Sequence, residues 1–265
     1  MKFDKEYTQY WSSAVSKSVD GTIIAGVNEA KHFLQYLGIK RDDRVLDLGC
    51  SFGRMNEALA VYSDKIFGID PDPYAIEKAN LQPYREVCQG TAEHTEFDKE
   101  FFDVVFCWAV FDVVDHKKGF TEINRILKNG GKLLLTGKND NYFPDDSLAY
   151  KAEKNAFLKE FPNKFTDVSA VLGNFQQLGF KLDKLYIFYR RGDFGLLNFI
   201  DQGDEARDSY VGYDYLVICH KIAESDIDGF HSINLEAPFS KTAVAMAVEA
   251  GFSGPEEFFK SIGID

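Results

Sequence analysis

The chain of 265 residues is 45% hydrophobic, which is enough to bury a core in one domain with additions or in two small domains. Its 42 acidic residues outnumber its 30 basic residues and give a formal net charge of -12. Because a nucleic-acid partner requires Lys and Arg to displace counterions from phosphates, we expect no such partner.

The N-terminus and the cysteines indicate the cellular compartment of the protein. The first residues, MKFDKEYTQYWSS, lack the apolar core of a secretory signal. No stretch approaches the ~18 apolar residues of a membrane span. The cysteines are scattered and form no CxxC pair, which indicates small core residues in a reducing compartment. The sequence therefore predicts a cytoplasmic protein with no membrane partner and no metal, and it leaves the oligomeric state open.

Helical and strand patterns alternate between residues 26 and 137. Apolar spacing predicts helices over residues 26–38, 54–62, 73–81 and 117–128. Short apolar runs predict strands over residues 44–49, 65–70, 84–90, 101–111 and 130–137. Strands that alternate with helices form a mostly parallel sheet covered on both faces, and its ligand binds at the carboxyl ends of the strands.

The pattern changes after residue 137. Residues 145–178 contain two helical patterns, and residues 184–191 and 213–221 form two strand patterns joined by a polar loop. With no helix between them, we expect these strands to pair antiparallel.

A different composition begins at about Ala223 and predicts a separate helical extension. Ser240 suits the N-cap of one helix, and Pro255 suits the first position of another. We therefore divide the chain into a domain over residues 1–222 and an extension over residues 223–265.

The stretch VLDLGCSFGR, residues 45–54, predicts a strand that ends in a glycine turn before a helix. Such a turn presents backbone N–H groups to a ligand. It lacks the GxGxxG of dinucleotide-binding proteins. Asp70 ends the next strand, where a carboxylate can accept both ribose hydroxyls. Taken alone, the glycines also fit an ordinary turn, and Asp70 also fits a solvated surface acid. Together, the glycine turn and Asp70 indicate a nucleoside ligand without a pyrophosphate.

Five stretches resemble a known family in their order and spacing: VLDLGCSFGR, GIDPDP, GTAEH, FDVVFCWAVFDVVDH and EINRILKNGGKLLLTGK. They are similar to the signature of class I S-adenosylmethionine-dependent methyltransferases over residues 40–140, and more loosely to residue 221. The resemblance implies a Rossmann-like, doubly wound α/β fold with a seven-stranded mixed sheet whose last strand is antiparallel. It also implies S-adenosylmethionine as the cofactor.

The resemblance assigns the cofactor site residue by residue. The methionine part is expected against Asp47, Gly49, Cys50, Ser51 and Gly53. The ribose and adenine are expected against Asp70, Pro71, Thr91, Ala92 and Glu93. Cys107 and Trp108 are expected beside the sulfonium. Thr91 stands where the family usually has Asp, so a weaker bond to the adenine amino group is expected.

The catalytic and acceptor residues are predicted from the turns that follow the strands. Asp112 is the candidate general base, because an apolar setting among Phe111, Val113 and Val114 would raise its pKa. His116 is expected in solvent. The candidate acceptor-binding residues are Tyr7, Tyr10, Trp11, Lys138, Asn139, Tyr142, Arg190 and Arg191. The three aromatic residues equally fit a core, and paired arginines are also common on protein surfaces. The expected acceptor is a small polar or anionic metabolite, such as a sugar or nucleotide-sugar intermediate, methylated on oxygen or nitrogen.

Two other functions stay open at this point. A non-catalytic protein that binds S-adenosylmethionine would carry the same cofactor motifs but methylate nothing. An NAD-dependent oxidoreductase could use a similar sheet, although the missing GxGxxG weakens this alternative.

Replacing Asp70 tests the predicted ribose contact. We expect Asp70→Ala to weaken S-adenosylmethionine binding at least about tenfold, because losing charge-assisted bonds costs about 1.5–3 kcal/mol. Calorimetry measures this change directly. An unchanged dissociation constant in a folded variant would remove Asp70 from the site.

Overall fold

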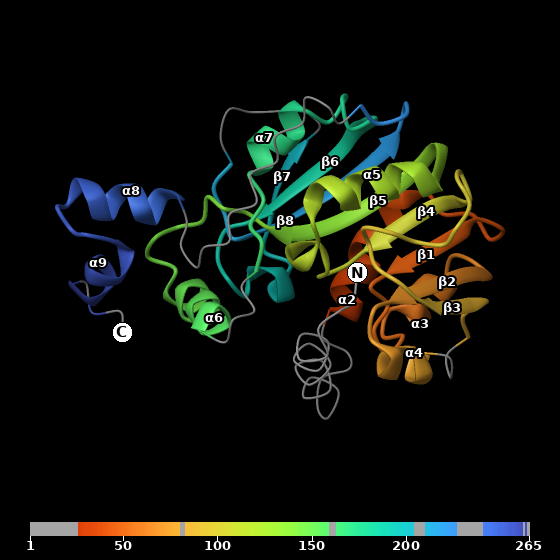
Figure 1. Ribbon diagram of the computed structural model, residues 1–265, viewed down its shortest axis with the longest axis horizontal. Coiled ribbons are helices and arrows are strands. Elements are labelled where there is room, and N and C mark those ends of the chain that lie inside the picture. The colour runs from red at the N-terminus through yellow and green to blue at the C-terminus, as the bar shows by residue number, and fades with distance from the viewer. Residues whose placement is uncertain are drawn as a thin grey trace.

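A mixed sheet of eight strands forms the centre of the molecule (Figure 1). The computed structural model describes residues 26–79, 83–158, 163–203, 210–226, 241–261 and 263. The strands are β1 (Arg44–Leu48), β2 (Lys65–Asp70), β3 (Glu86–Gln89), β4 (Phe102–Cys107), β5 (Leu127–Lys138), β6 (Phe180–Phe188), β7 (Ile200–Gly203) and β8 (Asp214–Lys221). Their order in the sheet is β3-β2-β1-β4-β5-β8-β6-β7.

The first five strands are parallel, and β8 lies antiparallel between β5 and β6. This arrangement confirms the predicted doubly wound mixed sheet and the antiparallel pairing of the last two long strands. The predicted count of seven strands is too low by one. The additional strand, β7, pairs with β6 at the edge of the sheet. It was missed because its four residues, IDQG, are largely exposed and show no apolar alternation.

The helices connect and cover these strands. They are α2 (Val27–Leu34), α3 (Asn56–Ala60), α4 (Pro73–Ala79), α5 (His116–Ile126), α6 (Ser147–Leu158), α7 (Val168–Gly173), α8 (Lys241–Glu249) and α9 (Pro255–Ser261). A short 3-10 helix, η2 (Phe111–Val113), precedes α5. Asp115 caps α5 by accepting a hydrogen bond from the backbone of Lys118 at 3.1 Å, so the helix begins immediately after η2.

Two apolar clusters lie on the two faces of the sheet. Helices α5 and α7 contribute Phe120 and Leu172 to the first cluster, which also contains Leu133 of β5. Helices α2 and α3 contribute Phe33 and Leu59 to the second cluster. Each fully buried side chain of this size contributes about 1.5–3 kcal/mol through the hydrophobic effect. The sheet is therefore held from both sides, and its strand ends stay in register at the site described below.

The C-terminal helices α8 and α9 lie beyond the end of the sheet, near α6 (Figure 1). Lys241, at the start of α8, forms ion pairs with Asp140 at 2.7 Å and Asp167 at 2.6 Å. Pro255 is the first residue of α9, as predicted, whereas Ser240 lies outside the described residues. The division at residue 222 stays a prediction.

Among the described residues, no helix combines the length and the apolar composition needed to cross a bilayer.

Candidate active site

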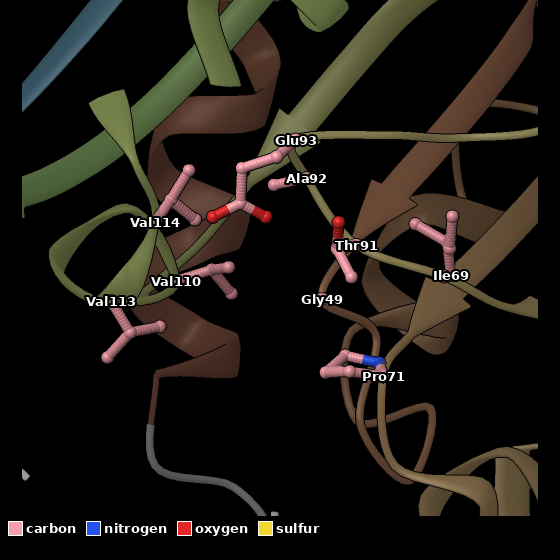
Figure 2. A pocket seen from close by; sticks show the side chains of 10 residues that line it. Gly49, Ile69, Pro71, Thr91, Ala92, Glu93, Val110, Val113 and Val114 are labelled. Carbon is pink, nitrogen blue, oxygen red and sulfur yellow. The ribbon is translucent and has the colours of Figure 1, made fainter. Parts of the chain in front are cut away.

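A cavity opens where the parallel strands β1, β2 and β4 end (Figure 2). Apolar side chains make up most of its walls. Val110, Val113 and Val114 lie on one side, and Pro71, Thr91 and Ile69 lie on the other (Figure 2). The remaining lining residues are Gly49, Gly90, Ala92 and Glu93. Two facing apolar walls with polar groups at their margin suit a flat, partly polar ligand.

The turn after β1 is hydrogen-bonded to the end of β2. The backbone N–H groups of Gly49 and Cys50 both donate to the carbonyl oxygen of Ile69, at 2.8 and 3.0 Å. Gly49 has φ +78°, and a Cβ atom there would overlap the side chain of Val110. Glycine is thus required on two counts: the left-handed backbone conformation and the close approach of the opposite wall.

Asp70 joins the same turn to β2 through its side chain. Its Oδ2 accepts a hydrogen bond from the backbone of Ser51 at 2.9 Å, and its Oδ1 accepts one from Asp72 at 3.0 Å. Burial raises the pKa of Asp70 to about 6, although both hydrogen bonds act in the opposite direction. The carboxylate therefore holds the turn in place at the predicted ribose position.

Asp47 is the most enclosed acid of this region, with 2% of its surface exposed. Burial raises its pKa to about 7, against a hydrogen bond from Tyr84 and the charge of Arg54. The Tyr84 hydroxyl donates to Asp47 Oδ2 at 2.6 Å. Sequence reasoning missed Tyr84, because no spacing relates a residue that precedes β3 to one in β1.

Asp112 lies in a charged setting, so the expected apolar setting is wrong. Lys138 Nζ, at the end of β5, is 3.1 Å from Asp112 Oδ2 and 3.3 Å from a carboxylate oxygen of Glu153 on α6. The single turn of η2 directs consecutive side chains to different sides. Val113 lines the cavity while Asp112 faces Lys138.

Lys138 belongs to a polar cluster formed by Asp112, Lys138, Glu153, Arg191, Tyr213 and Asp214. Arg191 donates to the Tyr213 hydroxyl at 2.7 Å, and that hydroxyl in turn donates to Glu153. Burial raises the pKa of Asp214 to about 7; the charge of Lys138 opposes this rise and that of Asp112 adds to it. The cluster contains three carboxyl groups and two basic side chains, so it has no excess of positive charge.

The structure separates the other predicted acceptor residues. Arg190 points to the surface, where it pairs with Asp145 at 2.5 Å, whereas Arg191 joins the polar cluster. Tyr142 is buried and packs edge-on against Tyr213, with ring centroids 5.5 Å apart. Asn139 is buried and donates to backbone carbonyl groups. Tyr7, Tyr10 and Trp11 lie outside the described residues.

Cys107 and Trp108, expected beside the sulfonium, have buried side chains that are not among the cavity lining. They belong to the two apolar clusters on opposite faces of the sheet, and the indole of Trp108 stacks on Phe106 at 5.6 Å. Ser51 and Gly53 belong to the glycine turn, where both have positive φ.

His116 is fully buried, so its expected exposure to solvent is wrong. Its ring stacks on Phe111 at 4.5 Å, and Nε2 lies 3.1 Å from the Phe111 carbonyl oxygen. Burial lowers the pKa of His116 to about 4. Phe111 of η2 thus packs against the first residue of α5.

Five lining residues were not predicted as site residues: Ile69, Gly90, Val110, Val113 and Val114. Two of them had a usable signal, because Ile69 directly precedes Asp70 and Gly90 begins the GTAEH stretch. The valines resemble core residues in the sequence. Only the tertiary structure shows that this turn passes over Gly49.

Comparison with known proteins assigns the central part of the chain to a protein family. Residues 46–135 match the family described as a methyltransferase domain. An uncharacterized methyltransferase, YcgJ, of Bacillus subtilis is 31% identical over 116 residues, which cover 41% of this chain and 45% of that protein. The sterol 24-C-methyltransferase of Kluyveromyces lactis is 28% identical over 177 residues, covering 60% of this chain and 46% of that protein. The chain thus spans less than half the length of these two relatives.

A solved structure from Thermotoga maritima, described as an S-adenosylmethionine-dependent methyltransferase, has the same fold. It aligns with a TM-score of 0.59 and 19% identity, over 82% of this chain and 100% of that chain. At this identity the likeness concerns the fold alone. The sequence match over residues 46–135 begins within β1 and ends within β5, and it includes every residue that lines the cavity.

The raised pKa of Asp47 predicts a pH-dependent loss of stability in the ligand-free protein. An unfolded Asp loses its proton near pH 4, whereas folded Asp47 keeps its proton up to about pH 7. Between these values the unfolded state is favoured, so the free energy of unfolding falls as the pH rises. We expect Asp47→Asn to raise that free energy by roughly 1–4 kcal/mol at pH 7.5 and to change it little at pH 4.

Urea unfolding at both pH values measures the difference. Asp64→Asn is the control, because the Asp64 side chain is 60% exposed. An equal effect of Asp47→Asn at pH 4 and pH 7.5 would contradict the raised pKa.

Proposed function

We propose that this chain, which carries a class I S-adenosylmethionine-dependent methyltransferase domain over residues 46–135, transfers a methyl group from that cofactor to a small polar acceptor. The observation that carries the proposal is the glycine turn, bonded through Asp70 to the end of β2 beside the cavity. A carboxylate and an apolar slot at neighbouring strand ends suit a nucleoside.

The residues at the cavity fit the three parts of this cofactor. The apolar walls around Val113 and Pro71 would enclose the adenine, with Thr91 and Glu93 at its polar edge. Asp70 would accept from the ribose hydroxyls. Asp47 and the turn of Gly49 would face the methionine part, where an ammonium group would favour the ionised form of Asp47. When bound, the cofactor supplies an electrophilic methyl group on a positively charged sulfur.

The polar cluster supports a polar, uncharged acceptor for this chain. The cluster lies next to η2 at the carboxyl end of β5. In such folds, ligands bind where the parallel strands end. The positive charges of Lys138 and Arg191 are already balanced by acidic partners, so an anionic acceptor would have to displace them. The name of the Kluyveromyces relative refers to a sterol, whereas buried ion pairs favour a smaller acceptor with several uncharged polar groups.

We propose Asp112 as the group that receives the acceptor's proton. Its carboxylate is held by Lys138 at 3.1 Å, and its neighbour Val113 lines the cofactor cavity. These two observations support a base that Lys138 orients and that belongs to the part of the polar cluster next to the cofactor cavity. The alignment of acceptor, methyl group and sulfur supplies the remainder of the rate enhancement.

Ligand binding and turnover test the proposed function together. A ligand that binds only the folded state raises the melting temperature, so S-adenosylmethionine and S-adenosylhomocysteine should stabilise the protein and NAD should not. Transfer of a labelled methyl group to a library of neutral sugars, amines and carboxylic acids then identifies the acceptor. Stabilisation by NAD alone would contradict the proposal, and cofactor binding without any transfer would favour the non-catalytic alternative.

Replacement of Asp112 tests the proposed base. Asp112→Asn keeps the shape of the side chain but removes its basicity, so kcat on a hydroxyl acceptor should fall by about 10²–10⁴. The affinity for S-adenosylhomocysteine should stay within a few-fold of the original value. Asp145→Asn, which alters a carboxylate that is 66% exposed, serves as the control. If Asp112→Asn keeps a normal kcat and Asp214→Asn lowers it, Asp214 would be the group that receives the acceptor's proton.

A further inference from the structure

Both walls of the cofactor cavity are attached to the start of α5. Val113 and Val114, on one wall, directly precede Asp115, the N-cap residue of this helix. Glu93 belongs to the lining on the loop between β3 and β4, and its Oε1 accepts a hydrogen bond from the backbone of Asp115 at 2.8 Å. The distance between the walls therefore depends on how the β3–β4 loop is held against α5.

The part of this loop that lines the cavity is a tight turn. Thr91 and His94 exchange two backbone hydrogen bonds, at 3.4 and 3.3 Å, and Ala92 between them is buried. Residues 95–101 continue to β4 without forming a helix or a strand. Backbone hydrogen bonds attach the end of this segment to α5, from Glu100 to the carbonyl oxygen of Arg125 at 3.0 Å and from Phe101 to that of Ile126 at 2.9 Å. Side-chain contacts hold the part next to the turn.

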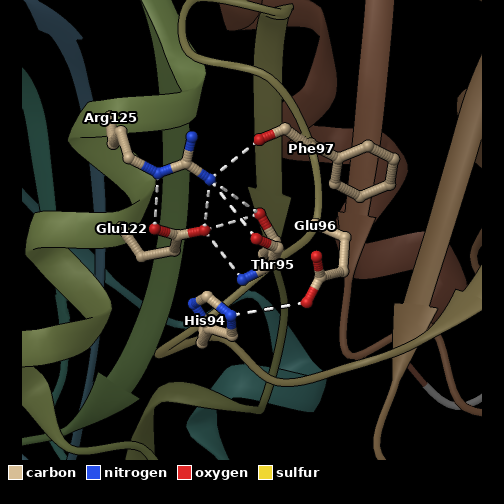
Figure 3. Close-up of polar contacts among 6 residues, drawn as sticks. All are labelled: His94, Thr95, Glu96, Phe97, Glu122 and Arg125. Carbon is tan, nitrogen blue, oxygen red and sulfur yellow. Dashed lines mark hydrogen bonds and ion pairs between the residues drawn. The ribbon is translucent and has the colours of Figure 1, made fainter.

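Glu122 of α5 supplies that contact immediately after the turn (Figure 3). Its Oε1 accepts from both the backbone N–H and the hydroxyl of Thr95, at 2.7 and 2.6 Å. Thr95 is 3% exposed and Glu122 is 6% exposed, so water does not replace these bonds. One carboxylate oxygen thus holds the residue that follows the turn.

Arg125 fixes the orientation of Glu122. Its guanidinium binds both carboxylate oxygens, with Nε 2.8 Å from Oε2 and Nη2 2.7 Å from Oε1 (Figure 3). The same Nη2 donates to the carbonyl oxygen of Phe97 at 2.8 Å. Burial alone would raise the pKa of Glu122, but the hydrogen bonds from Arg125 and Thr95 lower it below its usual value. The carboxylate stays ionised, and the loop is bound at two successive points.

We propose that Glu122 is a positioning residue for the cofactor: through Thr95 it holds the turn at residues 91–94 at the distance from Val113 and Val114 that admits adenine. This inference rests on the proposed function, because it assumes that the cavity takes the adenine of S-adenosylmethionine. Glu122 would thereby help the cavity to select adenine over other nucleobases, although its side chain contacts the loop and does not line the cavity.

Two substitutions weaken this attachment without removing bulk. Glu122→Gln keeps the size of the side chain but loses the charge that binds Arg125. Thr95→Val removes the hydroxyl group, which donates to Glu122 at 2.6 Å and accepts from Arg125 at 3.4 Å. The control is Asp103→Asn, because Asp103 binds Lys128 at 2.5 Å and the backbone of Arg44 at 2.9 Å at the other end of the sheet. We expect all three changes to reduce stability, and only the first two to affect the cavity.

Calorimetry with S-adenosylhomocysteine and S-inosylhomocysteine provides a readout that a purely structural role would not change. The second ligand carries an oxo group in place of the adenine amino group. We expect Glu122→Gln and Thr95→Val to bind S-adenosylhomocysteine roughly three- to tenfold more weakly and to discriminate less between the two ligands. Asp103→Asn should keep the original affinity and the original discrimination.

The outcomes separate this inference from the proposed function. If the original protein does not bind S-adenosylhomocysteine, the proposed function itself fails. If it binds and both variants retain its affinity and discrimination, the role of Glu122 is overturned. If Glu122→Gln does not fold, Thr95→Val decides the question alone. An equal loss of affinity in Asp103→Asn would also overturn the role, because it would show a general effect of stability.

Discussion

The hydrogen-bonded junction between the turn after β1 and the end of β2 is the contact on which the candidate site depends. Ile69 supplies one carbonyl oxygen to two backbone N–H groups of the turn, and Asp70 supplies a carboxylate oxygen to a third. Buried backbone donors need such partners, so the turn cannot move without losing several bonds. The same contacts leave Gly49 beneath Val110, where a side chain at residue 49 would not fit.

Helix α5 provides the second constraint, because it joins segments that are far apart in the sequence. Its N-cap region holds Glu93 and follows the valine wall, while Glu122 binds the chain that leaves the cavity. Its apolar side chains pack on the sheet with those of α7. A single helix therefore packs on the core and also contacts both walls of the cavity.

Two enclosed carboxyl groups in this region have raised pKa values. Burial raises the pKa of Asp47, near the end of β1, to about 7 and that of Asp214, in the polar cluster, to about 7. Such groups reduce stability in the ligand-free protein, because their charged forms are poorly solvated. A positively charged or hydrogen-bonding ligand would offset part of this cost. Groups of this kind are therefore expected where a protein binds such a ligand, and less often in a purely structural core.

The sequence by itself determined the parallel sheet, the glycine turn and the position of Asp70, because each depends on local patterns. Alternating strands and helices specify the crossovers, and glycine spacing marks the turn after β1. The edge strand β7 had no such pattern, since its side chains are largely exposed.

Only the tertiary structure decided which distant side chains meet. Asp112 and Lys138 are 3.1 Å apart, and Tyr84 donates to Asp47, although neither pair has a characteristic spacing in the sequence. His116 is the first residue of α5 but points into the core, where its ring stacks on Phe111 of η2. Periodicity predicts which residues form an element. The direction of polar side chains at its ends depends instead on the charges and rings that other elements bring to them.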